Sequence, residues 1–305
     1  PVIKVLKPKE AQNITDLSYL HVKYIQNNFK SKKILDEVRI AKAFCYANKC
    51  YGAESYIRGL SGYALELLVY HYGSFIKFIK EVSKSKDRLV IDIEKHYKNK
   101  QSVLMDINSS KLQSPIILVD PTFKQRNTLA ALSKETFERF KKACSDFLKN
   151  PSIEAFELQS TNINKVKEIA KKKNQEFLLL ETKTDKQAGD IAGSKLFKFY
   201  NFLTKEISRF FNIKEQGFNY NNKYAARCYF VVKGKGEIAI PGPSIKQKEH
   251  VKAFEKAHPN YSIKAGKLFA KEILNFDVKE FIENWKKKNL KQMKDMSITS
   301  LMVVG

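Results

Sequence analysis

The spacing of apolar residues changes near Asn150-Pro151, and this change constrains the fold more than any other feature. Before it, apolar residues recur at helical intervals, as in residues 35–45 and 137–147. After it, short apolar runs typical of strands alternate with helical segments. Because the residue before a proline disfavours helical geometry, we place a domain boundary there. The pattern predicts an α+β protein, mainly helical over residues 1–150 and α+β over residues 151–305.

Local signals predict the elements of the first domain. A histidine, His21, is expected on a short helix. Serines that can cap helices stand before two apolar-periodic segments, at Ser61 and Ser133. The expected elements are a strand at residues 1–6, helices at 34–48, 61–72 and 133–149, an exposed loop at 84–113 with a possible strand at 90–93, and a buried strand at 116–120.

Strand signals are more frequent in the second domain. We expect a strand at 176–181, a helix at 196–210, a hairpin of 224–232 with 236–240 joined through KGKG, a helix at 247–258, a second hairpin at 261–273 and a last helix from Asp277. The PGP sequence at 241–243 is expected to end the sheet. This order of elements predicts a small sheet with helices on one face, as in RNA-binding sheets.

The net charge narrows the classes of partner. Lys and Arg number 56 against 32 Asp and Glu, giving +24, and the excess is shared by both halves of the chain. A basic face along a folded body favours a long polyanion over one small acidic ligand. The alternative is a lysine-rich surface that serves solubility.

The cysteines and the apolar runs indicate the compartment. Cys45, Cys50, Cys144 and Cys228 have neither zinc-site nor CxxC spacing, which favours free thiols in a reducing environment. No signal peptide or long apolar run is present. We therefore expect a soluble, cytoplasmic protein without membrane contact.

Lys42, Tyr51 and Arg58 stand in order before the predicted helix cap Ser61. A capped helix start directs free N–H groups toward anions, and an arginine fork there matches a pair of phosphate oxygens. This arrangement suits a polyphosphate. The structural alternative is that Tyr51 packs in the core and that Glu66 pairs with Arg58 or Lys42.

Arg126 follows a buried apolar run and the turn Asp120-Pro121. It is expected to project from a structured loop, where it could read base edges or clamp phosphates. The alternative is an ion pair with Asp120. His21 lies among apolar neighbours and has no metal partner in the pattern, which favours a partly buried structural role.

Catalytic motifs are absent from the sequence. It contains no GxSxG, no Walker A loop and no Cys/His arrangement at recognisable spacing. Two-metal nucleotidyl transfer needs converging carboxylates, and the nearest pair is Asp92 and Glu94. No Gly-Ser turn precedes this pair, so we interpret it as surface charge. The sequence predicts no catalytic residue and no metal site in this chain.

The motifs nevertheless resemble those of one family, the archaeal-type (class I) CCA-adding tRNA nucleotidyltransferases. They are HVKYI (21–25), EVRIAKAF (37–44), YGAESYIRGLSGYALELL (51–68), YGSF (72–75) and VDPTFKQRNTLAALS (119–133), followed more loosely by PGPSIKQKEHVKAF and YSIKAGKLFAKEI. The resemblance implies an enzyme that adds C, C and A to the 3′ end of tRNA from CTP and ATP, with Mg²⁺ and without a nucleic-acid template. It also implies an architecture of catalytic head, helical neck, and α+β body with an inserted tail.

The resemblance assigns roles to five residues. His21, Lys42, Tyr51 and Arg58 match positions around the sugar and triphosphate of the incoming nucleotide. Arg126 matches the arginine that reads the base of that nucleotide together with the tRNA backbone.

The head of the family, with its Gly-Ser turn and metal-binding carboxylates, would precede Pro1. Residues 1–6 resemble the strand that follows the last of those carboxylates. We therefore expect this chain to be neck (1–150), body and tail (151–305), binding tRNA, ATP and CTP. A head domain or subunit would hold Mg²⁺, the chain alone would not transfer nucleotides, and a homodimer is possible.

Two basic helical stretches, 246–258 and 279–294, are candidates for tRNA phosphate contacts. Their representative residues are Lys246, Lys248, Lys286 and Lys287, and the alternative is that each charge run is a solvated helix face. The alternative function is a non-catalytic structured-RNA-binding protein derived from the same scaffold. A terminal transferase of the poly(A)-polymerase type is a weaker third.

Overall fold

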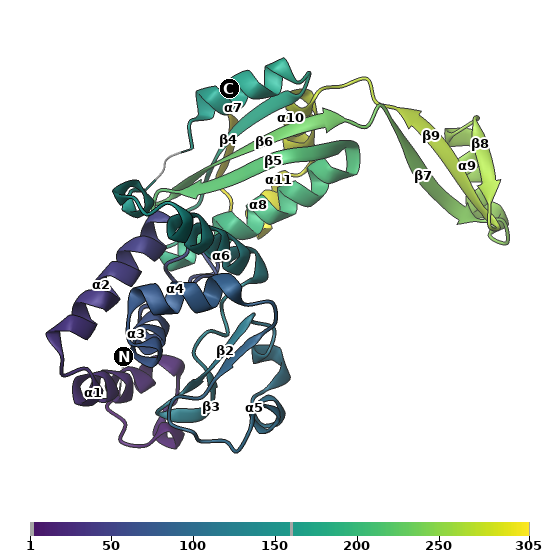
Figure 1. Cartoon of the computed structure of the whole chain (residues 1–305). Helices are drawn as coiled ribbons and strands as arrows, with labels where there is room; N and C mark the ends of the chain where they lie inside the picture. The colour runs from purple at the N-terminus through teal and green to yellow at the C-terminus, as the bar shows by residue number, and fades with distance from the viewer. Residues whose placement is uncertain (1–2, 159–160, 305) are drawn as a thin grey trace. The chain divides into compact units, whose positions relative to one another are not determined.

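The computed structural model describes residues 3–158 and 161–304, and the chain divides into two compact units at residue 160 (Figure 1). Both units contain helices and strands, so the predicted α+β class is confirmed. The sequence placed the boundary at residue 150, where α6 (Lys134–Lys149) does end. Residues 151–158 stay with the first unit because the short helix η4 (Ile153–Phe156) packs against α2 (Lys32–Ala47).

Most helices of the first unit share one core: α1 (Ser18–Asn28), α2, α3 (Gly62–Tyr72), α4 (Phe75–Lys84), α6 and η4. The short helices η1 (Pro8–Glu10) and η2 (Ile14–Leu17) precede them in the chain. Phe44, Phe78 and Phe140 are wholly buried where α2, α4 and α6 meet. The predicted caps are confirmed: the Ser61 and Ser133 side chains accept hydrogen bonds from the third residues of α3 and α6.

A three-stranded sheet completes the first unit. β1 (Leu89–Ile91) lies parallel to the predicted buried strand β2 (Ile116–Asp120), and β2 pairs antiparallel with β3 (Phe123–Asn127). Successive side chains of a strand point to opposite faces. The odd-numbered residues of β2 therefore pack against α5 (Lys100–Asp106), while the even-numbered ones join the helical core.

Two predictions for this unit are wrong. Residues 84–113 are not an exposed loop: they form the end of α4, β1, α5 and the short helix η3 (Ser109–Lys111), because β2 offers them a second apolar face to cover. Residues 3–6 are not a strand, since the backbone N–H of Ile3 donates to the Asp16 side chain at 3.1 Å rather than to a neighbouring strand. The first two residues of that prediction lie outside the described residues.

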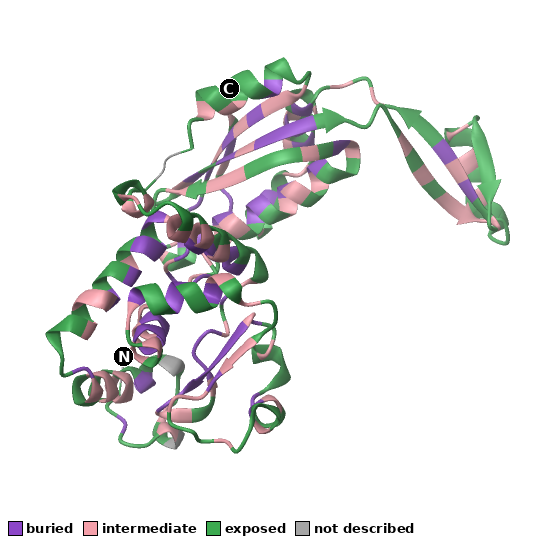
Figure 2. Cartoon of the chain, viewed as in Figure 1, coloured by how far each residue is buried: buried purple, intermediate pink, exposed green. Residues whose placement is uncertain are grey.

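A four-stranded antiparallel sheet of order β10-β4-β6-β5 forms the main part of the second unit. Its strands are β4 (Glu176–Lys183), β5 (Phe211–Tyr220), β6 (Ala225–Gly234) and β10 (Ser300–Val303), and its helices are α7 (Ile163–Lys172), α8 (Asp190–Phe210), α10 (Val278–Lys288) and α11 (Leu290–Asp295). Figure 2 shows buried positions along one stripe of α8 and along β6, where the core of this sheet lies. The predicted last helix is confirmed, with Asp277 as its cap.

A second sheet of order β7-β9-β8 follows β6 in the chain. It consists of β7 (Glu237–Ser244), β8 (Tyr261–Lys264) and β9 (Lys267–Ile273), with the predicted helix α9 (Lys248–Ala257) between β7 and β8. The predicted β8–β9 hairpin is confirmed. Its turn residues Ala265 and Gly266 have φ of 47° and 72°, as a two-residue turn with both central φ positive requires.

The predicted hairpin of β6 with β7 is wrong. Both edges of β6 are taken by β4 and β5, and β7 pairs instead with β9. The PGP sequence does not end the sheet either: β7 continues to Ser244 through an irregularity after Pro241. Proline is tolerated there because β7 is an edge strand, with one row of N–H groups unpaired.

The four cysteines are free and buried, as expected. Burial raises the pKa of the Cys50 thiol to about 12 and raises that of Cys45 as well. No helix within residues 3–158 and 161–304 has the length and apolar composition needed to cross a bilayer.

Candidate functional site

Lys42 and Tyr51 meet beside Gly62, the first residue of α3. A Cβ added to Gly62 would lie 3.1 Å from the Tyr51 phenol oxygen and 3.9 Å from Lys42 Nζ. Lys42 Nζ also donates to Glu66 Oε1 at 2.6 Å, so the ion pair considered as the structural alternative is present. An ammonium group has three donors. Pairing with Glu66 therefore does not exhaust the capacity of Lys42 to bind an anion.

A tight loop between α2 and α3 holds Tyr51 in place. Backbone hydrogen bonds close this loop, from Gly52 N to Leu60 O and from Gly59 N to Gly52 O, both 2.8 Å long. A Cβ at Gly59 would lie 2.1 Å from the carbonyl oxygen of Cys50, so no other residue fits without movement of the chain. The absence of a side chain at Gly59 thus allows the end of the loop to pack against the backbone at Cys50.

Arg58 lies on the outer side of this loop. Its φ is 53°, its side chain is exposed, and its carbonyl oxygen accepts a hydrogen bond from Ser133 N at 2.9 Å. The structure therefore ties the Arg58 backbone to the start of α6. Among the described residues, no contact of its guanidinium with Lys42 or Tyr51 is seen.

His21 and Arg126 converge on one buried carboxylate, that of Asp120. Asp120 Oδ2 accepts from Arg126 Nη1 at 2.7 Å and lies 3.0 Å from His21 Nε2. Asp120 Oδ1 accepts from the Tyr63 hydroxyl at 3.2 Å and from Thr122 N and Oγ1, both at 2.8 Å. The His21 ring also stacks on Tyr63, with ring centroids 4.0 Å apart and an interplanar angle of 18°.

Burial of Asp120 opposes its ionisation, but the hydrogen bond and charge of His21 and the charge of Arg126 outweigh it. The pKa of Asp120 falls to about 2. The pKa of Tyr63 is raised, first by burial and then by the Asp120 charge. The site is thus an ionised carboxylate surrounded by donors.

Tyr63 connects the side chains beside Gly62 with those around Asp120. It directly follows Gly62, where Lys42 and Tyr51 meet, and its hydroxyl reaches the Asp120 carboxylate that holds His21 and Arg126. Lys42, Tyr51 and His21 therefore lie against the first two residues of α3. Arg126 is linked to them through Asp120, and Arg58 stands apart. Arg126 lies on strand β3 rather than on a loop, which corrects the prediction.

Sequence reasoning missed Tyr63 as a site residue and treated Asp120 only as an alternative partner of Arg126. A partial signal for Asp120 was present, because it ends a continuous apolar run, but an aspartate there is buried only where distant side chains pair with it. Tyr63 gave no comparable signal.

Of the pair expected as surface charge, Glu94 is exposed and Asp92 is not. Asp92 is half-buried and its Oδ2 accepts from Tyr97 N at 2.9 Å, while Glu94 Oε1 accepts from the Tyr24 hydroxyl at 2.5 Å. Across the described residues, no group of three or more His, Cys, Asp or Glu could hold a metal ion. These side chains do not fit a Mg²⁺ site.

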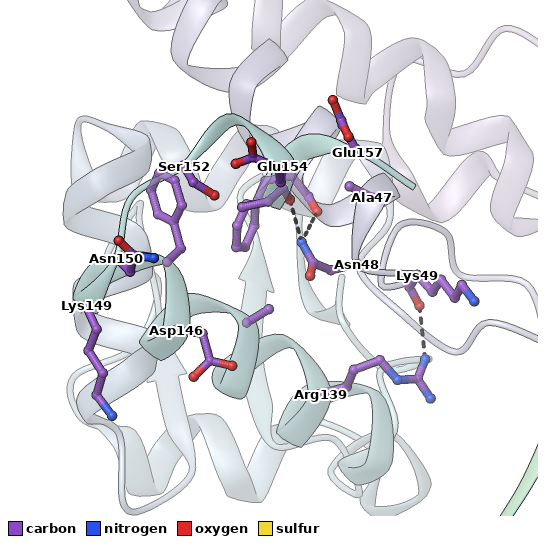
Figure 3. A pocket seen from close by; sticks show the side chains of 14 residues that line it. Ala47, Asn48, Lys49, Arg139, Asp146, Lys149, Asn150, Ser152, Glu154 and Glu157 are labelled. Carbon is purple, nitrogen blue, oxygen red and sulfur yellow. Dashed lines mark hydrogen bonds between the residues drawn. The ribbon is translucent and has the colours of Figure 1, made fainter. Parts of the chain in front are cut away.

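The first unit has two cavities of note. The larger, about 720 Å³, lies between the end of α2, α6 and η4 (Figure 3). Asn48 Nδ2 bridges it by donating to Ala155 O at 3.1 Å, and Arg139 Nη1 donates to Lys49 O at 3.2 Å. None of the nucleotide-site candidates lines it. The second, about 560 Å³, is bordered by Arg126.

Of the tRNA-contact candidates, Arg126 lies in the first unit, and the four lysines lie in the second. Lys246 and Lys248 are exposed, before and at the start of α9. On α10, Lys287 is exposed and Lys286 is half-buried. Their accessibility permits phosphate contacts.

Comparison with known proteins covers most of the chain. Residues 36–157 match the family described as tRNA nucleotidyltransferase, second domain. The CCA-adding enzyme of Methanocaldococcus jannaschii is 32% identical over 283 residues, which cover 88% of this chain and 60% of that protein. The CCA-adding enzyme of Nanoarchaeum equitans is 40% identical over 137 residues, 45% of this chain and 34% of that protein. The CCA-adding enzyme of Saccharolobus islandicus is 30% identical over 211 residues, 69% of this chain and 46% of that protein. The chain spans between about a third and three fifths of the length of these relatives.

Proposed function

This chain is a homologue of archaeal CCA-adding enzymes, with residues 36–157 in the second-domain family of tRNA nucleotidyltransferases, and we propose that it forms the nucleotide- and tRNA-binding part of such an enzyme. The observation that carries the proposal is the meeting of Lys42 and Tyr51 at the first residue of α3, one residue before Tyr63 and its link to Asp120 and Arg126.

In the proposed site, the triphosphate lies at the start of α3. Helix N-termini attract phosphates because their N–H groups and dipole favour negative charge. Lys42 adds a positive charge and Tyr51 a hydroxyl donor beside the same residue. Both groups would hold the phosphates in the ground state and as charge develops on the leaving pyrophosphate.

The base would lie toward Arg126. Tyr63 directly follows the residue beside Lys42 and Tyr51, and it shares the Asp120 carboxylate with Arg126 and His21, which supports this direction. In the reaction, the tRNA 3′ hydroxyl attacks the α-phosphate, forming a phosphodiester bond and releasing pyrophosphate. The exposed side chain of Arg58 would reach the triphosphate by reorienting.

Mg²⁺ and the catalytic carboxylates would be supplied by a head domain or subunit. When bound, Mg²⁺ would stabilise charge on the reacting phosphates. Residues of this chain would bind and orient the nucleotide and the tRNA, and this chain alone would not transfer nucleotides.

The second unit would hold the tRNA. The acceptor arm is an A-form duplex, and its major groove is too narrow for protein side chains to read the bases. The contacts would therefore be made to the backbone, and recognition would depend on shape. Lys246, Lys248, Lys286 and Lys287 are the proposed phosphate contacts. A cytoplasmic location and a homodimer remain predictions.

Reconstitution tests the proposal. The chain is mixed with a separately expressed head domain of an archaeal CCA-adding enzyme, tRNA lacking CCA, labelled CTP or ATP, and Mg²⁺. Incorporation that needs both proteins is expected, and the chain alone should give none. Absence of incorporation with every head tested would contradict it.

Binding data then distinguish the alternative of a non-catalytic RNA-binding protein. That alternative predicts tRNA binding that CTP and ATP do not affect. For about 6–8 phosphate contacts, the slope of log affinity against log salt should be roughly −5 to −7 by the duplex rule. If CTP or ATP strengthens the binding of tRNA, the result favours the role as part of the enzyme.

A further inference from the structure

The two oxygens of Asp120 have separate partners. Oδ1 binds the Tyr63 hydroxyl and both donors of Thr122, and so fixes the turn after β2. Oδ2 receives Arg126 Nη1 at 2.7 Å and lies 3.0 Å from His21 Nε2. The Asp120 side chain is wholly buried, so water does not compete for either oxygen. One oxygen therefore binds Tyr63 and the turn residue Thr122, and the other holds the two candidate ligand-binding side chains.

Arg126 uses only part of its donor set in this arrangement. Nη1 is engaged by Asp120, whereas Nε is buried and has no hydrogen-bond partner within the described part of the chain. In a planar guanidinium, Nε–H and the second terminal nitrogen form an edge that matches a pair of acceptors. A buried N–H without a partner is rare enough in folded proteins to need an explanation.

A cavity of about 560 Å³ borders Arg126. It lies between the segment of η1 and η2 and strand β3, with Phe123 and Leu17 among its apolar lining residues. Its charged lining residues are Lys111 and Arg126, and no carboxylate lines it. A flat ligand with acceptor atoms on its edge suits this apolar and positively charged lining.

We propose that Asp120 is a positioning residue, which holds Nη1 of Arg126 so that the Nε edge of the guanidinium is presented to paired acceptors on the base of the bound nucleotide. The inference rests on the proposed function for the identity of the ligand. The positioning of Arg126 by Asp120 stands on the geometry alone. His21 shares Oδ2 and stacks on Tyr63, which restricts Arg126 further.

The variant Asp120→Asn separates positioning from simple support of the turn. Its amide has one acceptor and one donor group, so if its oxygen keeps the Thr122 bonds its NH₂ faces Arg126. Thr122→Val is the matched control, because it removes one donor from the other oxygen and leaves the Arg126 pair intact.

The first readout is the Arg126 Nε–H signal in ¹⁵N NMR spectra of the chain, assigned by its loss in Arg126→Lys. In the native chain and in Thr122→Val, we expect this signal to lie away from the position of exposed arginines and to be protected from hydrogen exchange. In Asp120→Asn it should move to the position of exposed arginines and exchange fast. An unchanged signal in folded Asp120→Asn would overturn the inference. If that variant does not fold, Asp120→Glu decides: displacement supports positioning, and a native-like signal refutes it.

The second readout is base selection in the reconstituted enzyme. Loss of one charged hydrogen bond corresponds to about 10- to 100-fold in kcat/KM. We expect Asp120→Asn and Arg126→Ala each to lose about that much and to alter the CTP/ATP preference alike, and the double variant to be no worse than Arg126→Ala. Thr122→Val should stay close to native.

The outcomes keep the two claims apart. If Asp120→Asn keeps native rates and preference while Arg126→Ala does not, the positioning role is refuted and the proposed function stands. If the native chain supports no incorporation with any head and CTP leaves the Arg126 signal unmoved, the nucleotide role fails. The hydrogen-exchange result still decides whether Asp120 positions Arg126.

Discussion

Single side chains in the first unit combine structural and binding roles. Lys42 is paired with Glu66 and yet lies beside the start of α3, and Arg126 is paired with Asp120 and yet keeps a buried Nε without a partner. The sequence suggested an ion pair as the alternative to a site for each cation. The structure contains both ion pairs, and neither uses all the donors of its cation.

Replacing Lys42 tests the triphosphate role. Lys42→Gln keeps a hydrogen-bonding group but removes the charge, so kcat/KM of the reconstituted enzyme should fall about 10- to 100-fold for CTP and ATP alike. Steady-state incorporation rates with each nucleotide measure this. Lys77→Gln, an exposed lysine of α4, is the control and should be neutral. A change in CTP/ATP preference at Lys42 would contradict a pure phosphate role.

Asp120 also predicts a pH dependence of stability. Its folded pKa of about 2 lies below its ordinary value of 3.8, so ionised Asp120 stabilises the fold above about pH 4 and this contribution is lost as pH falls toward 2. The difference corresponds to about 2 kcal/mol. Urea denaturation at pH 5 and pH 2 should show the native chain losing about that much more stability than Asp120→Asn. Equal losses would show that Asp120 is not ionised and paired in the fold.

At the scale of elements, caps and periodicity predicted the helices well, and strand pairing poorly. Ser61, Ser133 and Asp277 begin helices where expected because a cap acts on its own neighbours. The β6–β7 hairpin was wrong because pairing is not local: the largely polar β5 gave no strand signal, yet it occupies an edge of β6. The burial of Asp120 likewise depends on residues distant in sequence, His21 and Tyr63.

The contribution of the α6 cap to stability can be measured. Ser133 Oγ accepts from Thr136 N at 3.1 Å, so Ser133→Ala should lower the free energy of unfolding by about 1 kcal/mol. Its backbone N–H still binds Arg58 O, so the loop before α3 should keep its position. Urea denaturation measures the change, with Ser83→Ala inside α4 as the control, expected within about 0.5 kcal/mol of native. A loss no larger than the control's would refute the capping role.

At the scale of the whole molecule, the two units have different proposed roles. The first unit would hold the nucleotide and the second the tRNA, and the charge of +24 is spread over both. Composition predicted a polyanion partner but could not assign particular lysines. Accessibility to solvent excludes few of the candidate tRNA-contact lysines, since Lys246, Lys248 and Lys287 are exposed and Lys286 is half-buried.

Charge reversal on α10 tests this division. Lys286→Glu with Lys287→Glu should weaken tRNA binding, by about 1 kcal/mol or more if both lysines contact phosphates, and should leave the CTP/ATP preference unchanged. Lys171→Glu with Lys172→Glu makes the same charge change on α7 and serves as the control in tRNA titrations at fixed salt. Equal weakening by both pairs would indicate a general charge effect rather than contacts on α10.

Chemical protection of Lys42 tests most directly whether its surroundings at the start of α3 receive a nucleoside triphosphate. The chain is treated with an amine-acylating reagent, with or without CTP and tRNA. Mass spectrometry then follows the modification of each lysine. Cytidine, which has no phosphates, replaces CTP in the control. We predict that CTP slows acylation of Lys42 while cytidine does not, and that Lys77 reacts equally throughout. Acylation of Lys42 at the same rate with and without millimolar CTP would contradict the account.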